Sequence, residues 1–219
     1  MKIEKIKSRS VLFTFDAGDW DLNLQLILGR RYNYIIDTGL GSGSVSPILE
    51  YLGDNTKPIV VIITHHHWDH VWGNHFTRGC MIIAHRRCRE ILESEWDAMV
   101  ERHGRYVDGQ VEYCVPDLVF EEELYFPEDK IRLIYTPGHT IDGISVLDEE
   151  DQVLNAGDNI GDTMEELIPQ LDTELELYQS TLKKYQQLDF DTCISGHNKV
   201  LGKDVIEKIM ELTEKSGKE

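Results

Sequence analysis

A continuous apolar run, P-I-V-V-I-I, leads directly into residues 64–70, T-H-H-H-W-D-H. Such a run is typical of a strand that is buried on both faces. Side chains two apart in an extended segment point the same way, so His65 and His67 can bind one cation. Asp69 and His70 follow where the chain turns. Because imidazole and carboxylate are ligands that Zn²⁺ accepts, this context predicts a metal site and not a histidine-rich surface loop.

Three more potential ligands each follow a predicted strand and stand directly after a glycine. They are His139 in T-P-G-H-T, Asp158 in A-G-D and His197 in S-G-H. A glycine permits a tight turn and lets the backbone approach a bound ion closely. One histidine or aspartate after a strand is usually structural, but four such segments are hard to assemble by accident. The sequence therefore predicts one site built from the ends of several strands.

The order H-x-H-x-D-H, P-G-H, G-D, G-H resembles the metallo-β-lactamase superfamily, and within it the glyoxalase II-like metal-dependent hydrolases. The resemblance spans about Val11–His197. It implies the α/β class and the superfamily's four-layer αββα sandwich. Position by position, it implies a first metal ion bound by His65, His67 and His139, a second bound by Asp69, His70 and His197, and Asp158 bridging both.

Asp37, in the segment I-I-D-T-G, matches an aspartate that the superfamily carries after an early strand. The resemblance implies that it hydrogen-bonds a ligand-bearing segment and fixes its geometry. The alternative is an ordinary turn aspartate.

The resemblance implies two metal ions, and ligand type makes Zn²⁺ the expected metal; iron or manganese also accepts mixed histidine and carboxylate ligands. Zinc lowers the pKa of a bound water to about 7, so a metal-bound hydroxide is the expected nucleophile. One carboxylate, Asp158, can bind both ions and hold them roughly 3.5–4 Å apart. Asp69 is expected to act in catalysis by orienting the nucleophile and passing its proton on.

Several superfamily activities do not fit this sequence. The nuclease branch carries an inserted domain and needs a basic face, and true β-lactamases usually lack an aspartate equivalent to Asp158. The segment T-P-G-H-T resembles the glyoxalase II branch, but residues 141–143, I-D-G, replace its proline-glycine-serine run. The tail beyond His197 is also short for that branch's helical substrate domain. The expected function is therefore metal-dependent hydrolysis of a small-molecule ester, thioester or lactone.

Three alternatives stay open at this point. Sulfur (persulfide) dioxygenases use the same framework with one iron, held by residues that match His65, His139 and Asp158. A phosphodiesterase would use the same dimetal centre. A non-catalytic metal-binding module would keep all the ligands but block the open coordination position.

Charge and cysteine usage set expectations for partners and location. Against 22 Lys and Arg stand 40 Asp and Glu, a formal net charge of -18. Such a surface repels nucleic acid and anionic membranes, so a small-molecule substrate is the expected partner, and the oligomeric state is open. The first residues are too charged for a signal peptide, and the four cysteines have no close pairing. A cytoplasmic protein with reduced thiols is expected.

Hydrophobic periodicity and turn residues predict one domain over residues 1–219. The expected strands are 11–16, 22–28, 31–37, 58–63, 81–84, 131–135, 144–147, 152–155 and 192–194. The expected helices begin near Ser46-Pro47, with serine as N-cap, and cover about 86–103, 172–188 and 203–214.

Four histidines are expected to be structural or exposed. His66 occupies a variable position of the motif and is expected to point away from the metal ions, and His75, His85 and His103 lack ligand spacing. Trp68 and Trp72 could line an apolar pocket or belong to the core.

Overall fold

The computed structural model describes residues 1–77 and 79–216. The chain forms two compact units, unit 1 from Met1 to Glu121 and unit 2 from Glu122 to Glu219. The single domain over residues 1–219 stays a prediction, and residues 78 and 217–219 of that range lie outside the described part.

Unit 1 is built on one mixed sheet whose strands follow chain order from edge to edge. Its strands are β1 (Lys2–Lys5), β2 (Ser10–Asp16), β3 (Asp21–Leu28), β4 (Asn33–Ile36), β5 (Ile59–Ile62), β6 (Met81–His85) and β7 (Leu118–Phe120). The first four strands pair antiparallel, whereas β4 to β7 pair parallel. A parallel pair needs a crossover connection, and helices supply two of them.

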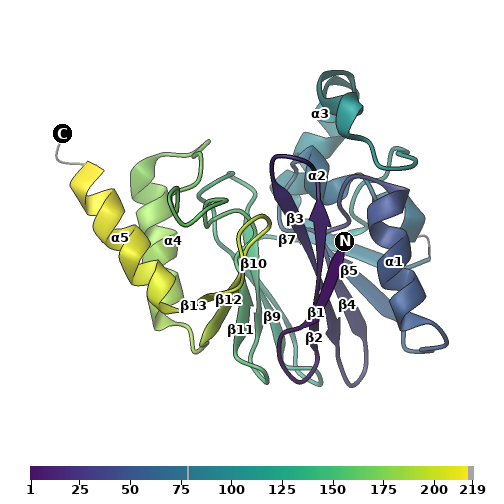
Figure 1. The fold of residues 1–219 in the computed structure, drawn as a ribbon, viewed down its shortest axis with the longest axis horizontal. Helices are drawn as coiled ribbons and strands as arrows, with labels where there is room; N and C mark the ends of the chain where they lie inside the picture. Colours follow the sequence, from purple (N-terminus) through teal and green to yellow (C-terminus); the bar gives the residue numbers. More distant parts are fainter. Residues whose placement is uncertain (78, 217–219) are drawn as a thin grey trace. The chain divides into compact units, whose positions relative to one another are not determined.

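These helices are α1 (Ser42–Leu52), between β4 and β5, and α3 (Arg86–His103), between β6 and β7 (Figure 1). The short helix α2 (Trp68–Val71) and the 3₁₀ turns η1 (Asn74–Thr77) and η2 (Gly104–Tyr106) complete the unit. Alternate strand residues such as Leu24, Leu26 and Val61 share one core with α1 and α3. The period of two therefore assigns one face of the sheet to these helices.

Helix α1 begins earlier than its sequence predicts. The expected start at Ser46-Pro47 is wrong, because the helix begins at Ser42 and Pro47 lies inside it. The backbone N–H groups of Ser42 and Gly43 donate to the carbonyls of Gln110 and Asp108. A distant loop thus satisfies donors that a helix start leaves free, and no local capping signal was needed.

Unit 2 holds a second mixed sheet in the order β13-β12-β11-β10-β9-β8. Its strands are β8 (Glu123–Phe126), β9 (Ile131–Tyr135), β10 (Ile144–Asp148), β11 (Val153–Asn155), β12 (Thr192–Ile194) and β13 (Leu201–Gly202). Strands β11 and β12 pair parallel, and the other neighbours pair antiparallel. The parallel connection carries α4 (Leu175–Gln187), and α5 (Asp204–Ser216) follows β13 beside it (Figure 1).

The core of unit 2 joins the sheet to α4 and α5. Leu154 and Cys193 from the strands pack with Tyr178, Leu182 and Ile209 from the helices, all with no exposed surface. Complete burial raises the pKa of the Cys193 thiol to about 12, so this cysteine belongs to the packing of its strand.

The sequence located the longer elements and missed several of the short ones. The predicted strands and helices near residues 131–135, 86–103 and 203–214 are confirmed. Strands β1, β7, β8 and β13 were not predicted; they have two to four residues each, too few to show a period. Across residues 1–77 and 79–216, no helix combines the length and apolarity needed to span a bilayer.

Candidate metal centre

The order of the unit 1 strands places two predicted site segments side by side. Strands β4 and β5 are parallel neighbours, so their carboxyl ends lie at the same edge of the sheet. Asp37 follows β4, and Thr64 and the histidine segment follow β5. Asp37 has a left-handed φ of 62°, which few residues other than glycine, asparagine and aspartate adopt. Strain of this kind persists only where surrounding contacts hold it.

Those contacts are hydrogen bonds to the buried Asp37 carboxylate. Its Oδ1 accepts from the backbone N–H of Thr64 at 2.7 Å. Its Oδ2 accepts from the Thr64 hydroxyl at 2.8 Å and from Nδ1 of His70 at 2.8 Å. Since the Thr64 proton points to Asp37, the Thr64 oxygen accepts from Nδ1 of His65 at 3.0 Å. One carboxylate therefore orients the His70 ring directly and the His65 ring through Thr64.

The predicted ligands of unit 1 lie together at this sheet edge. The rings of His65 and His67 have centroids 4.7 Å apart, and those of His65 and His70 are 4.1 Å apart. Ligand atoms of His65 and His67 lie within 4.8 Å of each other, as do those of Asp69 and His70. Close imidazoles and a carboxylate form a donor set suited to a divalent cation.

The predicted ligands of unit 2 likewise gather at one edge of their sheet. Strands β9 and β11 run in the same direction because each pairs antiparallel with β10, and β12 is parallel to β11. His139, Asp158 and His197 follow these three strands. Asp158 is buried, and its Oδ2 lies 3.1 Å from Nε2 of His197 and 3.8 Å from Nε2 of His139. The carboxylate thus stands beside both imidazoles of its unit.

The His139 loop is held by residues that sequence reasoning missed. Asn159 accepts the His139 backbone N–H at 2.9 Å and donates to the Thr136 carbonyl at 2.7 Å. From α4, Thr181 donates to the Pro137 carbonyl at 2.6 Å. The position of Asn159 directly after G-D was the available signal, but its partners are 20 or more residues away in sequence.

Gly138 is required here by close approach. A Cβ at this position would lie 2.5 Å from Asn159 Oδ1 and 2.6 Å from the Tyr178 ring. The glycine next to Asp158 has a different reason, because Gly157 adopts a positive φ of 54°.

The orientation of the histidine rings fits a bound metal ion. His65, His70 and His139 each use Nδ1 for a hydrogen bond, to Thr64, Asp37 and the Gln170 carbonyl at 2.7 Å respectively. A ring that donates through Nδ1 carries its lone pair on Nε2 when neutral. Metal-binding histidines are held in this way, so the residues present fit the implied group.

Of the histidines predicted not to be ligands, three have contacts of other kinds. His75 pairs with Glu112 at 2.9 Å. His85 accepts the Arg87 backbone N–H at the start of α3, at 3.2 Å. His103 stacks on Trp68 with centroids 5.0 Å apart.

The two tryptophans considered as pocket residues differ in burial. Trp72 is fully buried in the core of unit 1, whereas Trp68 is half-buried.

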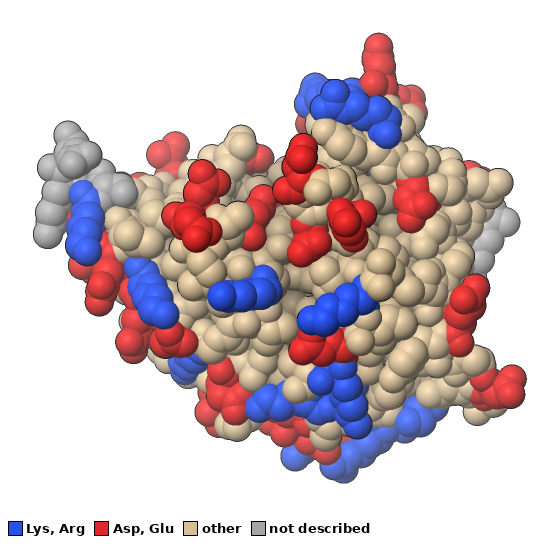
Figure 2. Space-filling view, in the orientation of Figure 1, with Lys and Arg blue, Asp and Glu red and all other residues tan. Residues whose placement is uncertain are grey.

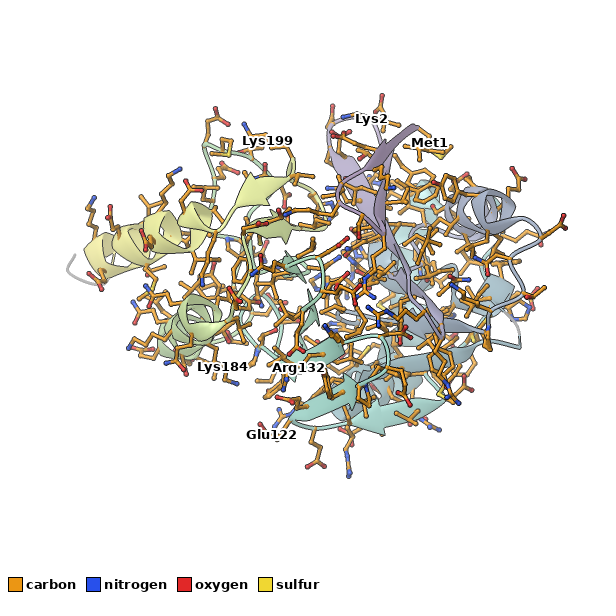
Figure 3. The ribbon with its side chains drawn as sticks, turned by 90° about the horizontal axis from the view of Figure 1, so that it is seen from below. Met1, Lys2, Glu122, Arg132, Lys184 and Lys199 are labelled. Carbon is orange, nitrogen blue, oxygen red and sulfur yellow. The ribbon has the colours of Figure 1, made fainter. Side chains whose placement is uncertain are left out.

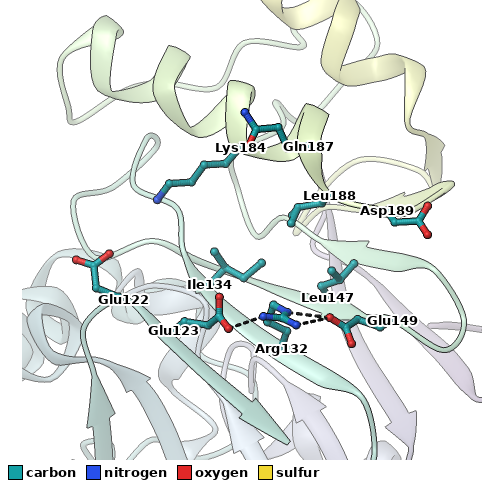
Figure 4. A pocket seen from close by; sticks show the side chains of 10 residues that line it. All are labelled: Glu122, Glu123, Arg132, Ile134, Leu147, Glu149, Lys184, Gln187, Leu188 and Asp189. Carbon is teal, nitrogen blue, oxygen red and sulfur yellow. Dashed lines mark hydrogen bonds and ion pairs between the residues drawn. The ribbon is translucent and has the colours of Figure 1, made fainter. Parts of the chain in front are cut away.

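A separate pocket of about 630 Å³ lies in unit 2 and contains none of the predicted ligands. Ile134 and Leu147 line it, with Lys184 from α4 and Arg132 from β9 (Figures 3 and 4). Arg132 is paired with Glu123 at 2.5 Å and Glu149 at 2.7 Å. Its charge is thus matched by two glutamates within the pocket wall.

Comparison with known proteins identifies the family. The model of the metallo-beta-lactamase superfamily matches residues 21–197, more than half of the chain. The chain belongs to the metallo-beta-lactamase superfamily. The match to the family model ends at His197, so the matched residues include all the motif segments on which the sequence resemblance rests.

Over the aligned residues, relatives are between a quarter and a third identical to this chain. A beta-lactamase-like protein 2 homolog of Caenorhabditis elegans is 29% identical over 82% of the chain and 56% of its own length. A hydroxyacylglutathione hydrolase of Rhodopseudomonas palustris is 29% identical over 64% of the chain and 52% of its own length. An acyl-coenzyme A thioesterase of Gallus gallus is 26% identical over 64% of the chain and 58% of its own length. The chain therefore spans about half the length of these relatives.

Solved structures confirm the predicted fold class. A metallo-beta-lactamase from Pontibacter korlensis has a TM-score of 0.76 at 16% identity, covering 97% of this chain and 98% of its own. One from Hirschia baltica has a TM-score of 0.76 at 18% identity, covering 97% of both chains. At such identities the likeness concerns the fold, in which each unit contributes a mixed sheet and its helices.

Proposed function

We propose that this protein is a metal-dependent hydrolase that acts on a small-molecule ester, thioester or lactone. The observation that carries the proposal is the shared orientation of His65, His70 and His139. Their Nδ1 atoms form hydrogen bonds, so that in the neutral rings the lone pair that binds a metal ion lies on Nε2. Family membership supports it, because relatives in the superfamily are named as a hydrolase and a thioesterase.

The proposed metal ligands are the seven residues derived from the sequence, and two zinc ions are the proposed cofactors. The ligands are His65, His67, Asp69, His70, His139, Asp158 and His197. When bound, zinc would activate water near neutral pH and polarise the substrate carbonyl. Hydrolysis then breaks the bond from the acyl carbon to sulfur or oxygen, with water supplying the hydroxyl of the acid and the proton of the leaving group.

The chain's own residues have distinct parts in this proposal. Asp37 and Thr64 hold the rings of His65 and His70, and Asn159 holds the backbone of His139. Asp69 is the proposed proton carrier, since its carboxylate Oδ2 lies only 3.7 Å from His70 Nε2. A carboxylate in that position can orient a polar group and accept its proton.

Thioesters are the favoured substrates among the three classes. One relative is named as an acyl-coenzyme A thioesterase and another as a hydroxyacylglutathione hydrolase, although the chain spans about half of each. The net charge of -18 argues for a small-molecule substrate and against nucleic acid or an anionic membrane. Among the described residues the four cysteines form no disulfide, which agrees with the proposed cytoplasmic location.

The test is metal content by elemental analysis together with a hydrolysis screen on untagged protein. About two equivalents of zinc per chain are expected, with turnover of at least one thioester, ester or lactone. Asp158→Ala and Asp158→Asn should lose metal and most activity. Asp189→Ala, an exposed aspartate of the same unit, is the matched control and should retain both.

Two results would contradict the proposal. Full turnover by metal-depleted Asp158→Ala protein would exclude the proposed centre. One equivalent of iron with oxygen consumption would replace the hydrolase with the dioxygenase.

A further inference from the structure

A cluster of stacked rings surrounds Trp68, which lies between the proposed ligands His67 and Asp69. The ring of His103 is nearly parallel to that of Trp68, at 8° and 5.0 Å between centroids. The ring of Tyr106 stacks on Trp68 at 21° and 4.9 Å. The end of α3 and the turn η2 are thereby fixed against the ligand segment, within unit 1 alone. Trp68, His103 and Tyr106 all remain partly exposed.

Two arginines, Arg102 and Arg105, belong to the corner of unit 1 that consists of Trp68, the end of α3 and the turn η2. Burial lowers the pKa of His103, the charges of Arg102 and Arg105 lower it further, and the charge of Asp69 opposes them. Arg102 directly precedes His103 at the end of α3, and Arg105 directly precedes Tyr106 in η2. Both arginines therefore belong to the chain segment whose rings stack on Trp68.

The guanidinium groups of this corner are not neutralised by carboxylates. In the described part of the chain, neither Arg102 nor Arg105 has an ion-pair partner within 4 Å. Arg105 lies over the Tyr106 ring, 4.6 Å from its centroid, and donates to its hydroxyl at 2.8 Å. Figure 2 shows basic side chains over α3 at the top of the view, with acidic side chains next to them.

A structural role explains only one of the two arginines. Arg102 lies in the last turn of α3, where a cation stabilises the helix end. Arg105 lies beyond that helix, in η2, and contacts its neighbour Tyr106. An exposed guanidinium that lies over a ring and donates one hydrogen bond to it keeps other N–H donors available for a planar anion such as a carboxylate.

We propose that Arg102 and Arg105, beside the ring wall of Trp68 and Tyr106, bind an anionic substituent of the substrate. This inference rests on the proposed hydrolase and adds to it a substrate class: acyl compounds that carry a carboxylate or phosphate near the scissile group. The residues determine specificity and do not touch the reacting atoms, so their effect is expected in KM more than in kcat.

The test compares thioesters that differ only in charge. One pair is the S-phenyl half-thioester of adipic acid and its terminal amide, which place the charge on the acyl side. The other is the acetyl thioester of 4-mercaptobenzoate and that of 4-mercaptobenzamide, which place it on the leaving group. Released thiol is measured in each case. In at least one pair, kcat/KM should be about tenfold higher for the anion, as one charge-assisted contact provides.

The variant is Arg102→Gln/Arg105→Gln, and its matched control is Arg86→Gln. Arg86 begins α3 and pairs with Glu121 at 2.8 Å, far from the corner in sequence. The double variant should bring the ratio of the two kcat/KM values close to one while the amides are hydrolysed as before. Arg86→Gln should keep the wild-type ratio, and added salt should reduce it. Equal kcat/KM values within both pairs for the wild type would overturn the inference.

A binding measurement separates this inference from the hydrolase itself. If no thioester is hydrolysed, benzoate and benzamide are titrated into the protein by calorimetry. Benzoate binding that the double variant loses would retain the anion site and refute the hydrolase. Turnover without charge preference would retain the hydrolase and refute the anion site. Neither turnover nor benzoate binding would refute both.

Discussion

Replacing Asp37 tests how much one buried carboxylate contributes to the ligand segment. Asp37 is 2% exposed and accepts three hydrogen bonds, two from Thr64 and one from His70. In Asp37→Ala, the Thr64 N–H and the His70 Nδ1–H cannot turn away, whereas the Thr64 hydroxyl can. A buried donor without an acceptor costs about 1–3 kcal/mol, and an alanine at left-handed φ costs about 1 kcal/mol more. The expected loss in the free energy of unfolding is therefore about 3–7 kcal/mol.

Asp37→Asn separates the charge from the shape. Asparagine tolerates the φ of 62° and keeps one carbonyl oxygen, but its amide group faces a donor. The expected loss is about 1–3 kcal/mol. Zinc affinity should fall about 10–100-fold, because the His70 ring loses its charged acceptor.

Urea unfolding of metal-free protein gives the stability change, and competition with a chelating dye gives the zinc affinity. Asp54→Ala, an exposed aspartate of the same unit, is the control and should change neither. An Asp37→Ala variant that loses less than about 1 kcal/mol would refute the hydrogen-bond reasoning.

Three further outcomes follow from unit 2. Gly138→Ala should destabilise the protein by about 1–3 kcal/mol and weaken metal retention, because the added Cβ would clash with its neighbours. Gly104→Ala, where an added Cβ meets open space, is the control and should do neither, as thermal melts and elemental analysis will show. Burial raises the pKa of Tyr185 from 10.0 to about 12. The stability that this group contributes is complete below pH 10 and is lost as the pH rises to 12, so Tyr185→Phe should flatten the fall in unfolding free energy over that range. Cys193, whose pKa burial also raises, should not react with Ellman's reagent at neutral pH until the protein unfolds, and equal thiol counts for folded wild type and Cys193→Ala would confirm this.

The sequence predicts best where the pattern is long. The apolar run before Thr64 and the helical spacing from Arg86 to His103 each specify one element, and both are confirmed. The start of α1 is not predictable locally, because its first N–H groups bond to carbonyls near residue 110. A single sequence shows no such pairing over 60 residues.

The candidate site shows the same difference between residues that a sequence pattern predicts and contacts that it does not. The ligand-type side chains are visible as motifs, since imidazoles and carboxylates at strand ends have few other uses in such number. Their supports are not visible. Asn159 resembles any polar loop residue, and the carbonyl of Gln170 belongs to the backbone of a residue with no signature. The corner around His103 escaped notice because stacking depends on where α3 ends and not on spacing.

The hydrogen bonds that Asp37 accepts from Thr64 and His70 also define which residues would have to be transferred together if this site were moved to another scaffold. Grafting residues 64–70 alone onto another scaffold would carry the histidines without the carboxylate that turns two of their rings. The smallest portable unit is the end of a parallel strand pair, β4 and β5, with Asp37 on one strand and Thr64 on the other. A designer who copies the motif but not the neighbouring strand would obtain imidazoles free to rotate.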